Sequence, residues 1–170
     1  EVDYEETTSD GCPIDWDVWV SPTGSDDGYG SEDQPFQTIG WALAVVVGTE
    51  DNPVTINLTE GTFAPSTNGE TYSIIMQSNI NLIGQSEEVT ILDAEQTAGV
   101  LLIDECINVI ISDLTITGSG EIAVSLPSGD ASLVTIQDIT ITGNVGNTLL
   151  ESRRKYYITG LNYTVTILRV

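Results

Sequence analysis

The chain has 170 residues, 40% hydrophobic and 18% charged, a composition typical of one folded domain rather than a disordered segment. Its 26 acidic and four basic side chains give a net charge of −22, and residues 1–150 contain no Lys, Arg or His. Such a body repels nucleic acid and anionic membranes, and no apolar run reaches the ~18 residues of a membrane helix. The charge suits solubility, cation binding or a basic partner, and a halophilic or marine setting explains it as well.

The chain begins with an acidic arm and continues into short structural elements. Residues 1–17 carry seven Asp or Glu side chains, which predicts an extended arm rather than a packed element. A strand over Val18–Val20 and a turn-rich loop over residues 21–34 follow. Apolar residues then recur at helical spacing as far as Gly48, so we predict a helix over residues 35–48 that caps one end of a β-stack.

From residue 54 onward the pattern is all strand, with runs of three to five residues separated by Gly, Asn, Asp or Ser. The segment Asp113–Ser119 returns 25 residues later as Asp138–Asn144, and self-similarity at such a period marks a stacked repeat architecture. Three short strands in each repeat are typical of a coil of a parallel β-helix. We therefore predict an all-β fold over residues 18–170, a right-handed parallel β-helix (solenoid) of about five coils. The expected strands are Val54–Leu58, Ser73–Met76, Ile80–Gly84, Val89–Leu92, Val100–Ile103, Val109–Ile111, Leu114–Ile116, Ala123–Leu126, Val134–Ile136 and Ile139–Ile141.

The last stretch, residues 148–170, continues the rhythm with a basic and aromatic composition found almost nowhere earlier. Terminal repeats are atypical because they cap the stack or contact something, and Tyr and Arg are common anchors of interfaces. When the acidic front of one copy contacts the basic back of another, the contact does not by itself close into a ring or dimer. Such a contact tends to generate a filament. We expect the following interface residues for a head-to-tail contact with a second copy: Arg153, Arg154, Lys155, Tyr156, Tyr157, Tyr163 and Arg169.

A family resemblance is carried by the order of several segments in the first part of the chain. These are Trp19–Gly28, Gln34–Ile39, Val54–Leu58, Gly61–Phe63, Ile80–Gly84 and Thr90–Asp93. Together they resemble the opening of secreted right-handed parallel β-helix proteins of the pectate-lyase-like superfamily, over residues 18 to about 145. The resemblance implies this fold and an extracellular or cell-surface location, while the superfamily includes lyases, hydrolases, adhesins and structural proteins.

The resemblance also bears on catalysis. Lyases of this fold use calcium and an Arg or Lys base, and residues 1–150 contain neither basic residue. Hydrolases of the fold use clustered Asp residues, for which Asp113 and Asp138 are the candidates because the repeat stacks them ~5 Å apart. Each is equally typical of a turn residue that introduces a strand, and we favour that interpretation. We therefore expect no enzymatic activity.

Three further sets of residues suggest binding or covalent chemistry. The loop carboxylates of Asp26, Asp27, Glu32 and Asp33 are oxygen ligands of the kind that Ca²⁺ prefers, although such loops are common without metal. Cys12 and Cys106 form either a disulfide or two buried thiols. Asn57 and Asn162 begin N-glycosylation sequons, a motif that also arises by chance in Thr-rich strands.

Two functional hypotheses follow. The leading one is a non-enzymatic extracellular structural protein that associates with itself head to tail, as a filament or surface-layer subunit, because nothing after the final strand covers the stack. The alternative is a carbohydrate-binding or carbohydrate-cleaving β-helix module acting on a neutral glycan, or a fragment of an adhesin.

Overall fold

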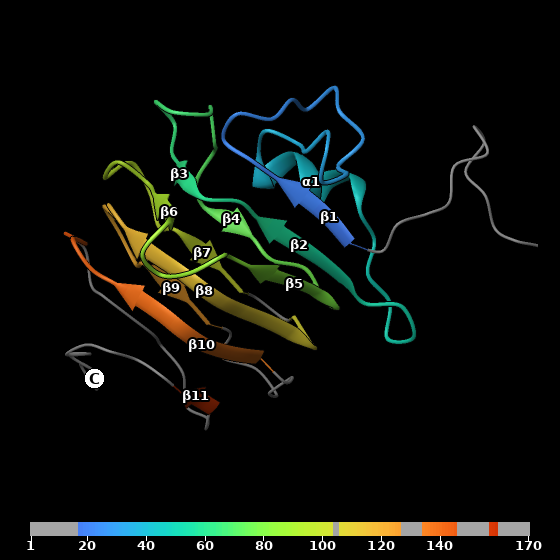
Figure 1. Cartoon of the computed structure of the whole chain (residues 1–170). Helices are drawn as coiled ribbons and strands as arrows, with labels where there is room; N and C mark the ends of the chain where they lie inside the picture. Colours follow the sequence, from blue (N-terminus) through green and yellow to red (C-terminus); the bar gives the residue numbers. More distant parts are fainter. Residues whose placement is uncertain (1–16, 104–105, 127–133, 146–156, 160–170) are drawn as a thin grey trace, which may run out of the picture.

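A computed structural model of the chain describes residues 17–103, 106–126, 134–145 and 157–159 (Figure 1). These residues form an all-β parallel solenoid with one short helix, as the repeat pattern predicted. Among them, no helix is long and apolar enough to cross a membrane. The elements are β1 (Asp17–Val20), α1 (Ile39–Val45), β2 (Val54–Leu58), β3 (Gly61–Phe63), β4 (Ile74–Ile75), β5 (Ile80–Ile83), β6 (Thr90–Asp93), β7 (Leu101–Leu102), β8 (Val109–Thr117), β9 (Val124–Ser125), β10 (Val134–Ile141) and β11 (Tyr157–Thr159).

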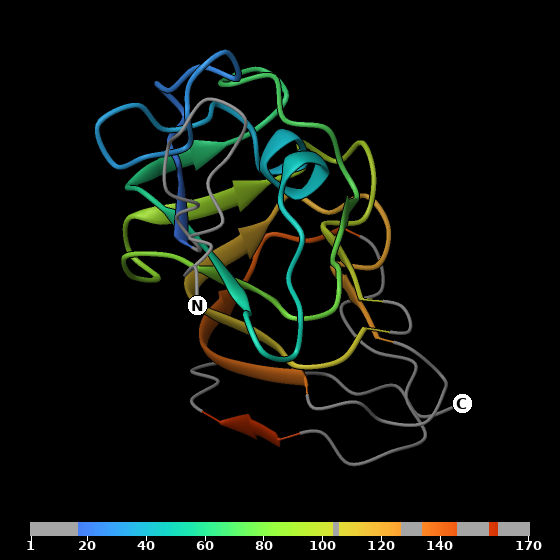
Figure 2. The same cartoon turned by 90° about the vertical axis from the view of Figure 1, so that its right-hand side faces the viewer.

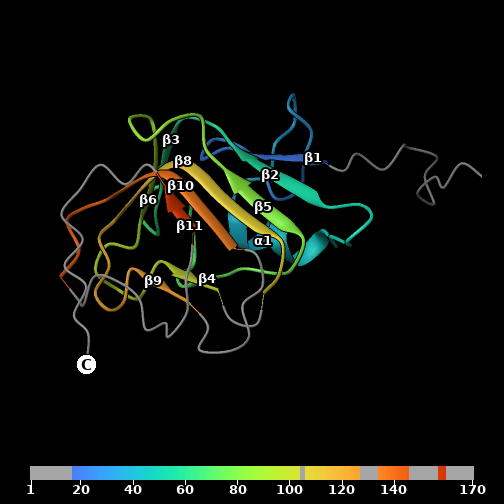
Figure 3. The same cartoon turned by 90° about the horizontal axis from the view of Figure 1, so that it is seen from below.

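The strands form three walls, each made of parallel strands contributed by successive turns of the chain. The first wall has the order β1-β2-β5-β8-β10-β11, the second pairs β3 with β6 and β6 with the end of β8, and the third is β4-β7-β9. Figure 3, seen along the stack, shows these walls enclosing a narrow interior. Three complete turns are described, β2-β3-β4, β5-β6-β7 and β8-β9, and the predicted total of about five coils stays a prediction.

Apolar side chains stack on one another because parallel pairing places equivalent positions in register. Ile56 pairs with Leu82, Leu82 with Ile111, and Ile111 with Ile136, and all four side chains are at most 5% exposed. Most of their neighbours in the chain are more exposed, as strand alternation requires, while Ser112 next to the bend in β8 is buried. Burying each such side chain stabilises the fold by roughly 1.5–3 kcal/mol, so this inward column is the core of the solenoid.

Two bends are built from residues in the left-handed backbone region. Asn79 and Asn108, with φ of 60° and 53°, precede β5 and β8, and the Asn108 Nδ2 donates to Asn79 Oδ1 at 3.0 Å. Asp113 and Asp138, with φ of 59° and 49°, bend β8 and β10 in their middles. Each of these strands therefore spans two walls, which is why runs expected as separate strands are single elements.

The helix is shorter than predicted. It covers residues Ile39–Val45 rather than 35–48, with Thr38 as N-cap, and Val46 is already extended. Phe36 forms a bridge with Val20 of β1 instead of joining the helix, because its N–H donates to Trp19 O at 2.9 Å. The run of three valines over residues 45–47 ends the helix because β-branched side chains disfavour helical backbone.

We predict that Ile111→Ala lowers the free energy of unfolding by about 2–5 kcal/mol, because Ile111 is fully buried between two stacked neighbours. The matched control is Ile110→Ala at the next position, where the side chain points outward and is 38% exposed. Its loss should stay below about 1 kcal/mol, measured by urea unfolding followed by circular dichroism. Equal losses for the two variants would contradict the inward assignment of Ile111.

Candidate functional site

The helix α1 carries no charged side chain, and its one polar side-chain group is the indole N–H of Trp41, yet only one side of the helix is buried. Ile39, Ala42 and Leu43 are at most 5% exposed and pack into the core, where α1 contacts β1 and β4. On the other side Trp41 is 44% exposed and Val45 is 47% exposed. Figures 1 and 2 place α1 near β1, in the half of the stack away from β10 and β11. This half of the solenoid therefore presents an apolar surface to solvent.

Part of the β1 backbone, in contrast, is already paired on its outer side. The outer edge of β1 is covered by the loop that follows it: Trp19 N–H donates to Gly30 O at 2.8 Å and Ser21 N–H donates to Phe36 O at 2.9 Å. The loop also donates a hydrogen bond to β1, from Phe36 N–H to Trp19 O. An open strand edge is a template for pairing with another chain, and here the chain's own loop covers it.

The first turn of α1 is held by three acceptor side chains. Thr38 Oγ1 accepts from Trp41 N at 3.1 Å, and the two carboxylate oxygens of Glu70 accept from Ile39 N at 2.7 Å and Gly40 N at 3.1 Å. Asp26 accepts from Thr38 N at 3.0 Å and from Thr38 Oγ1 at 2.9 Å. The N–H groups that a helix start leaves unpaired thus find partners, and acidic side chains suit that end of the helix dipole.

Asn68 ties the same region to the neighbouring loop. Its Nδ2 donates to Gln37 O at 2.8 Å, its Oδ1 accepts from Ala64 N at 2.9 Å, and Gln37 Nε2 donates back to Asn68 O at 3.1 Å. Sequence analysis missed Asn68 and Glu70. The only local signal was the polar turn Asn68-Gly69-Glu70, in which Gly69 has φ of 76°, and nothing in it points to a helix start 30 residues earlier.

Glu70 is an unusual acid in this setting, because its side chain is only 2% exposed. Burial raises the pKa of Glu70 above its ordinary value of 4.5, and the negative charge of Asp26 adds to that rise. Hydrogen bonds from the N–H groups of Ile39, Gly40 and Thr71 act in the opposite direction. The pKa of Tyr72 is also raised, mainly by burial, and its hydroxyl donates to Phe63 O at 2.7 Å.

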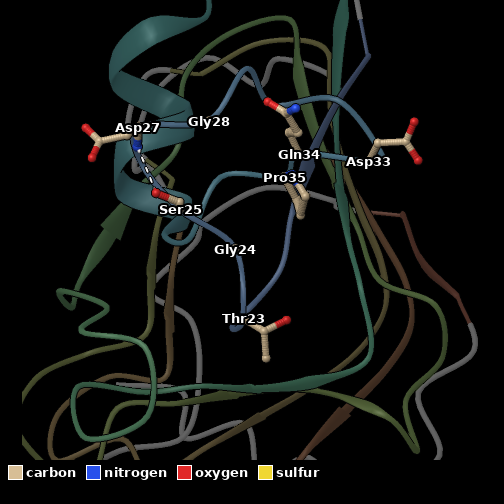
Figure 4. A pocket seen from close by; sticks show the side chains of 8 residues that line it. All are labelled: Thr23, Gly24, Ser25, Asp27, Gly28, Asp33, Gln34 and Pro35. Carbon is tan, nitrogen blue, oxygen red and sulfur yellow. Dashed lines mark hydrogen bonds between the residues drawn. The ribbon is translucent and has the colours of Figure 1, made fainter.

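The loop carboxylates predicted to bind calcium are not brought together. Asp26 is engaged with the start of α1, and Asp27 and Asp33 point to opposite sides of a shallow hollow of about 380 Å³ (Figure 4). Glu32 is exposed nearby. Across the described part of the chain, no three acidic, His or Cys side chains gather closely enough to hold a metal ion. The calcium site stays a prediction that this geometry does not favour.

Asp113 and Asp138 occupy the same bend in successive coils, since Ser112 pairs with Gln137 and Leu114 with Ile139. Asp113 accepts a hydrogen bond from the Ser112 hydroxyl at 2.6 Å, and Asp138 is exposed. Asp tolerates the left-handed backbone of these bends better than most residues. The geometry therefore fits the interpretation of both as turn residues.

The remaining predicted residues lie partly outside the described ranges. Cys106 is buried and its Sγ donates to Met76 O at 3.0 Å, while Cys12 lies outside, so the disulfide stays a prediction. Asn57 is half-buried in β2, and Asn162 lies outside. Of the interface residues, Tyr157 begins β11, where its backbone pairs opposite Thr135. The others fall outside the described ranges: Arg153, Arg154, Lys155, Tyr156, Tyr163 and Arg169.

We predict that replacing Glu70 changes how stability depends on pH. A carboxyl whose pKa is raised in the folded state contributes stability that is fully present below its ordinary pKa and is lost as pH rises through the raised value. We therefore compare the unfolding free energy of the native protein minus that of Glu70→Gln, from urea titrations at each pH. This difference should be most favourable to the native protein near ~pH 4 and should fall toward ~pH 8.

Glu50→Gln is the matched control, because Glu50 is exposed in the loop after α1, and it should show no such trend. A difference for Glu70→Gln that instead grows with pH would mean that the bonds from Ile39 and Gly40 outweigh burial.

We also predict that Asp138 acts through its backbone. Asp138→Gly should leave the thermal midpoint unchanged or raise it, because Gly adopts a φ of 49° without strain. Asp138→Val should cost about 1–2 kcal/mol, since a β-branched side chain disfavours that region. Equal thermal midpoints for the two variants would show that the bend imposes no such constraint.

Comparison with known proteins finds one family model that matches part of the chain, and this match is compatible with the resemblance to β-helix proteins. Residues 22–91 match the model of a protein family described as a protein of unknown function, DUF1565. No curated protein matches the chain. The matched span contains α1 and the side chains that hold its first turn: Asp26, Thr38, Asn68 and Glu70. This polar network therefore lies in the part of the chain that is similar to a known family.

Proposed function

We propose that this protein is a non-enzymatic extracellular structural module that associates end to end with other copies of itself. The observation that carries the proposal is the apolar outer side of α1, where Trp41 and Val45 are nearly half exposed. Neighbouring exposed apolar side chains that form a continuous patch are typical of interaction sites.

The position of that surface matters because of how solenoids end. Terminal repeats normally present a polar outer face, which keeps the stack soluble and stops it from growing. We infer that α1 is the N-terminal cap of a right-handed β-helix of about five coils. Its inner side covers the core through Ile39, Ala42 and Leu43, but its outer side lacks the polar residues that would end the stack.

The charge distribution supports an asymmetric contact. The four basic residues lie in residues 151–170, and 25 of the 26 acidic residues lie in residues 1–150. Opposite charges on the two ends favour contact between unlike surfaces, which continues from copy to copy instead of closing into a pair. An extracellular setting accords with the resemblance to secreted β-helix proteins.

The non-enzymatic part of the proposal rests on the roles that the candidate carboxylates already have. Asp26 and Glu70 accept backbone N–H bonds at the start of α1, and Asp113 and Asp138 lie at bends. A hydrolytic pair needs one carboxyl free to donate a proton and another free to act as base or nucleophile. Asp26 and Glu70 are thus committed to the start of α1, and Asp113 and Asp138 serve as turn residues in this proposal.

A glycan-binding module, the alternative function, is favoured by one observation. The hollow of Figure 4 is lined by hydroxyl, amide and carboxyl groups, and Tyr29 of the same loop is 81% exposed. An aromatic ring beside polar groups is a common arrangement for binding small polar ligands. Binding to neutral glycans that is lost in Tyr29→Ala would support this alternative.

We predict that the full-length protein associates in a concentration-dependent way. Light scattering coupled to size-exclusion chromatography should give a mass that rises continuously with concentration, because each added copy presents a new free end. Negative-stain images should show linear particles of varying length. A constant monomer mass over a hundredfold range of concentration (about 1 to about 100 μM) would overturn the proposal.

A further inference from the structure

We propose that the outer side of α1, formed by Trp41, Val45 and the following Val47, binds the β11 end of a second copy of this chain. This inference rests on the proposed function and names the two surfaces that meet. The receiving surface is called the α1 face below. Its partner is called the basic end and consists of residues 151–170, which include β11.

The α1 face has the properties of an anchor site. Trp41 and Val45 lie four residues apart on a helix and so share one side, and Val47 just beyond the helix is 75% exposed. Trp is among the residues that contribute most to binding when it is buried at the centre of an interface. The three side chains offer mostly apolar area, and their one polar group is the indole N–H of Trp41, which needs an acceptor when it is buried.

Part of the backbone at this end is already paired on its outer side. Loop residues Gly30 and Phe36 take the outward N–H and C=O groups of Trp19 and the N–H of Ser21. A strand from a second copy could add at this part of β1 only by displacing the loop, whereas side-chain packing on the α1 face requires no such displacement.

The charge around the α1 face selects the kind of partner. Asp26 accepts from Thr38 at the start of α1, and the exposed Asp27 follows it. Residues 1–150 also contain no basic side chain, so an apolar and basic partner fits this surface better than an acidic one, which like charges disfavour.

Within this protein only the basic end has that composition. It contains all four basic residues, one acidic residue and three of the six tyrosines. The chain's own residues 1–16 are a poor competitor, because they carry six acidic side chains and no basic one. In Figure 1 β11 lies across the stack from α1, so β11 of one copy can approach the α1 face of the next while both stacks keep the same direction.

Paired variants in the full-length chain test this assignment. Trp41→Glu should disable the α1 face, and Arg153→Glu with Arg154→Glu should disable the basic end, each weakening self-association by at least about tenfold. Ile75→Glu is the matched control: Ile75 is an exposed apolar residue, 61% exposed, on the β4 wall, and its variant should associate like the native protein. Circular dichroism should confirm that all variants are folded.

Mixing the two defective variants gives the decisive result. Each retains one intact surface, so a 1:1 mixture should form a heterodimer that grows no further. Failure of the mixture to associate, when each variant alone is monomeric and folded, would overturn the assignment. Association of Trp41→Glu at native strength would also overturn it, while leaving end-to-end association itself standing; a native protein that never associates would remove both.

A photo-cross-linking amino acid at position 41 identifies the occupant without weakening the contact. In a mixture of isotopically heavy and light copies, we expect heavy-to-light cross-links to peptides from residues 151–170. Cross-links within one copy to residues 1–16 would show that the chain covers its own α1 face. Cross-links between copies to any other segment would show that the basic end is the wrong partner surface.

Discussion

The parallel register of the strands is the constraint on which the rest of the structure depends. Because each turn repeats the last, one inward position becomes a column, such as Ile56, Leu82, Ile111 and Ile136 in the first wall. Stacking satisfies both the apolar side chains and the backbone groups of every interior turn. Only the two ends of a stack lack a neighbouring turn, so an end must be covered by other parts of the chain or remain exposed.

At the β1 end, backbone groups of β1 are paired whereas apolar side chains of α1 remain exposed. The loop over residues 21–36 pairs with the edge of β1, while α1 leaves Trp41 and Val45 facing solvent. Residues 1–150 contain no basic side chain, so the acidic groups of the first turns have no basic neighbour close to them in sequence. Glu70 and Asp26 are instead held by N–H and hydroxyl donors at the start of α1. Part of the desolvation cost of burying Glu70 remains, which its raised pKa expresses.

Much of the fold could be predicted from local pattern. Strand alternation identified the segments of β2, β5 and β10, and the repeated Asp-x-Thr-Ile-Thr-Gly motif identified the stacking of Asp113 on Asp138. The end of α1 was wrong because the run of three valines stops the helix, and its start was wrong because Phe36 joins β1 through a pairing that no local pattern encodes. The acceptors for the first turn of α1 were missed for the same reason, since Glu70 lies 31 residues from Ile39 along the chain.

The sequence by itself determined that the chain stacks parallel coils. It also determined that nearly all acidic residues lie before residue 151 and all basic residues after residue 150. Both follow from the sequence because hydrophobic periodicity and charge depend only on the order of the residues. Only the tertiary structure decided which side of α1 is buried, that Glu70 rather than a nearby residue supports its first turn, and that the edge of β1 is covered. These outcomes depend on contacts between segments some 15 to 30 residues apart along the chain, such as Ser21 with Phe36 and Ile39 with Glu70. The number of residues in each turn of the solenoid decides which segments come into contact.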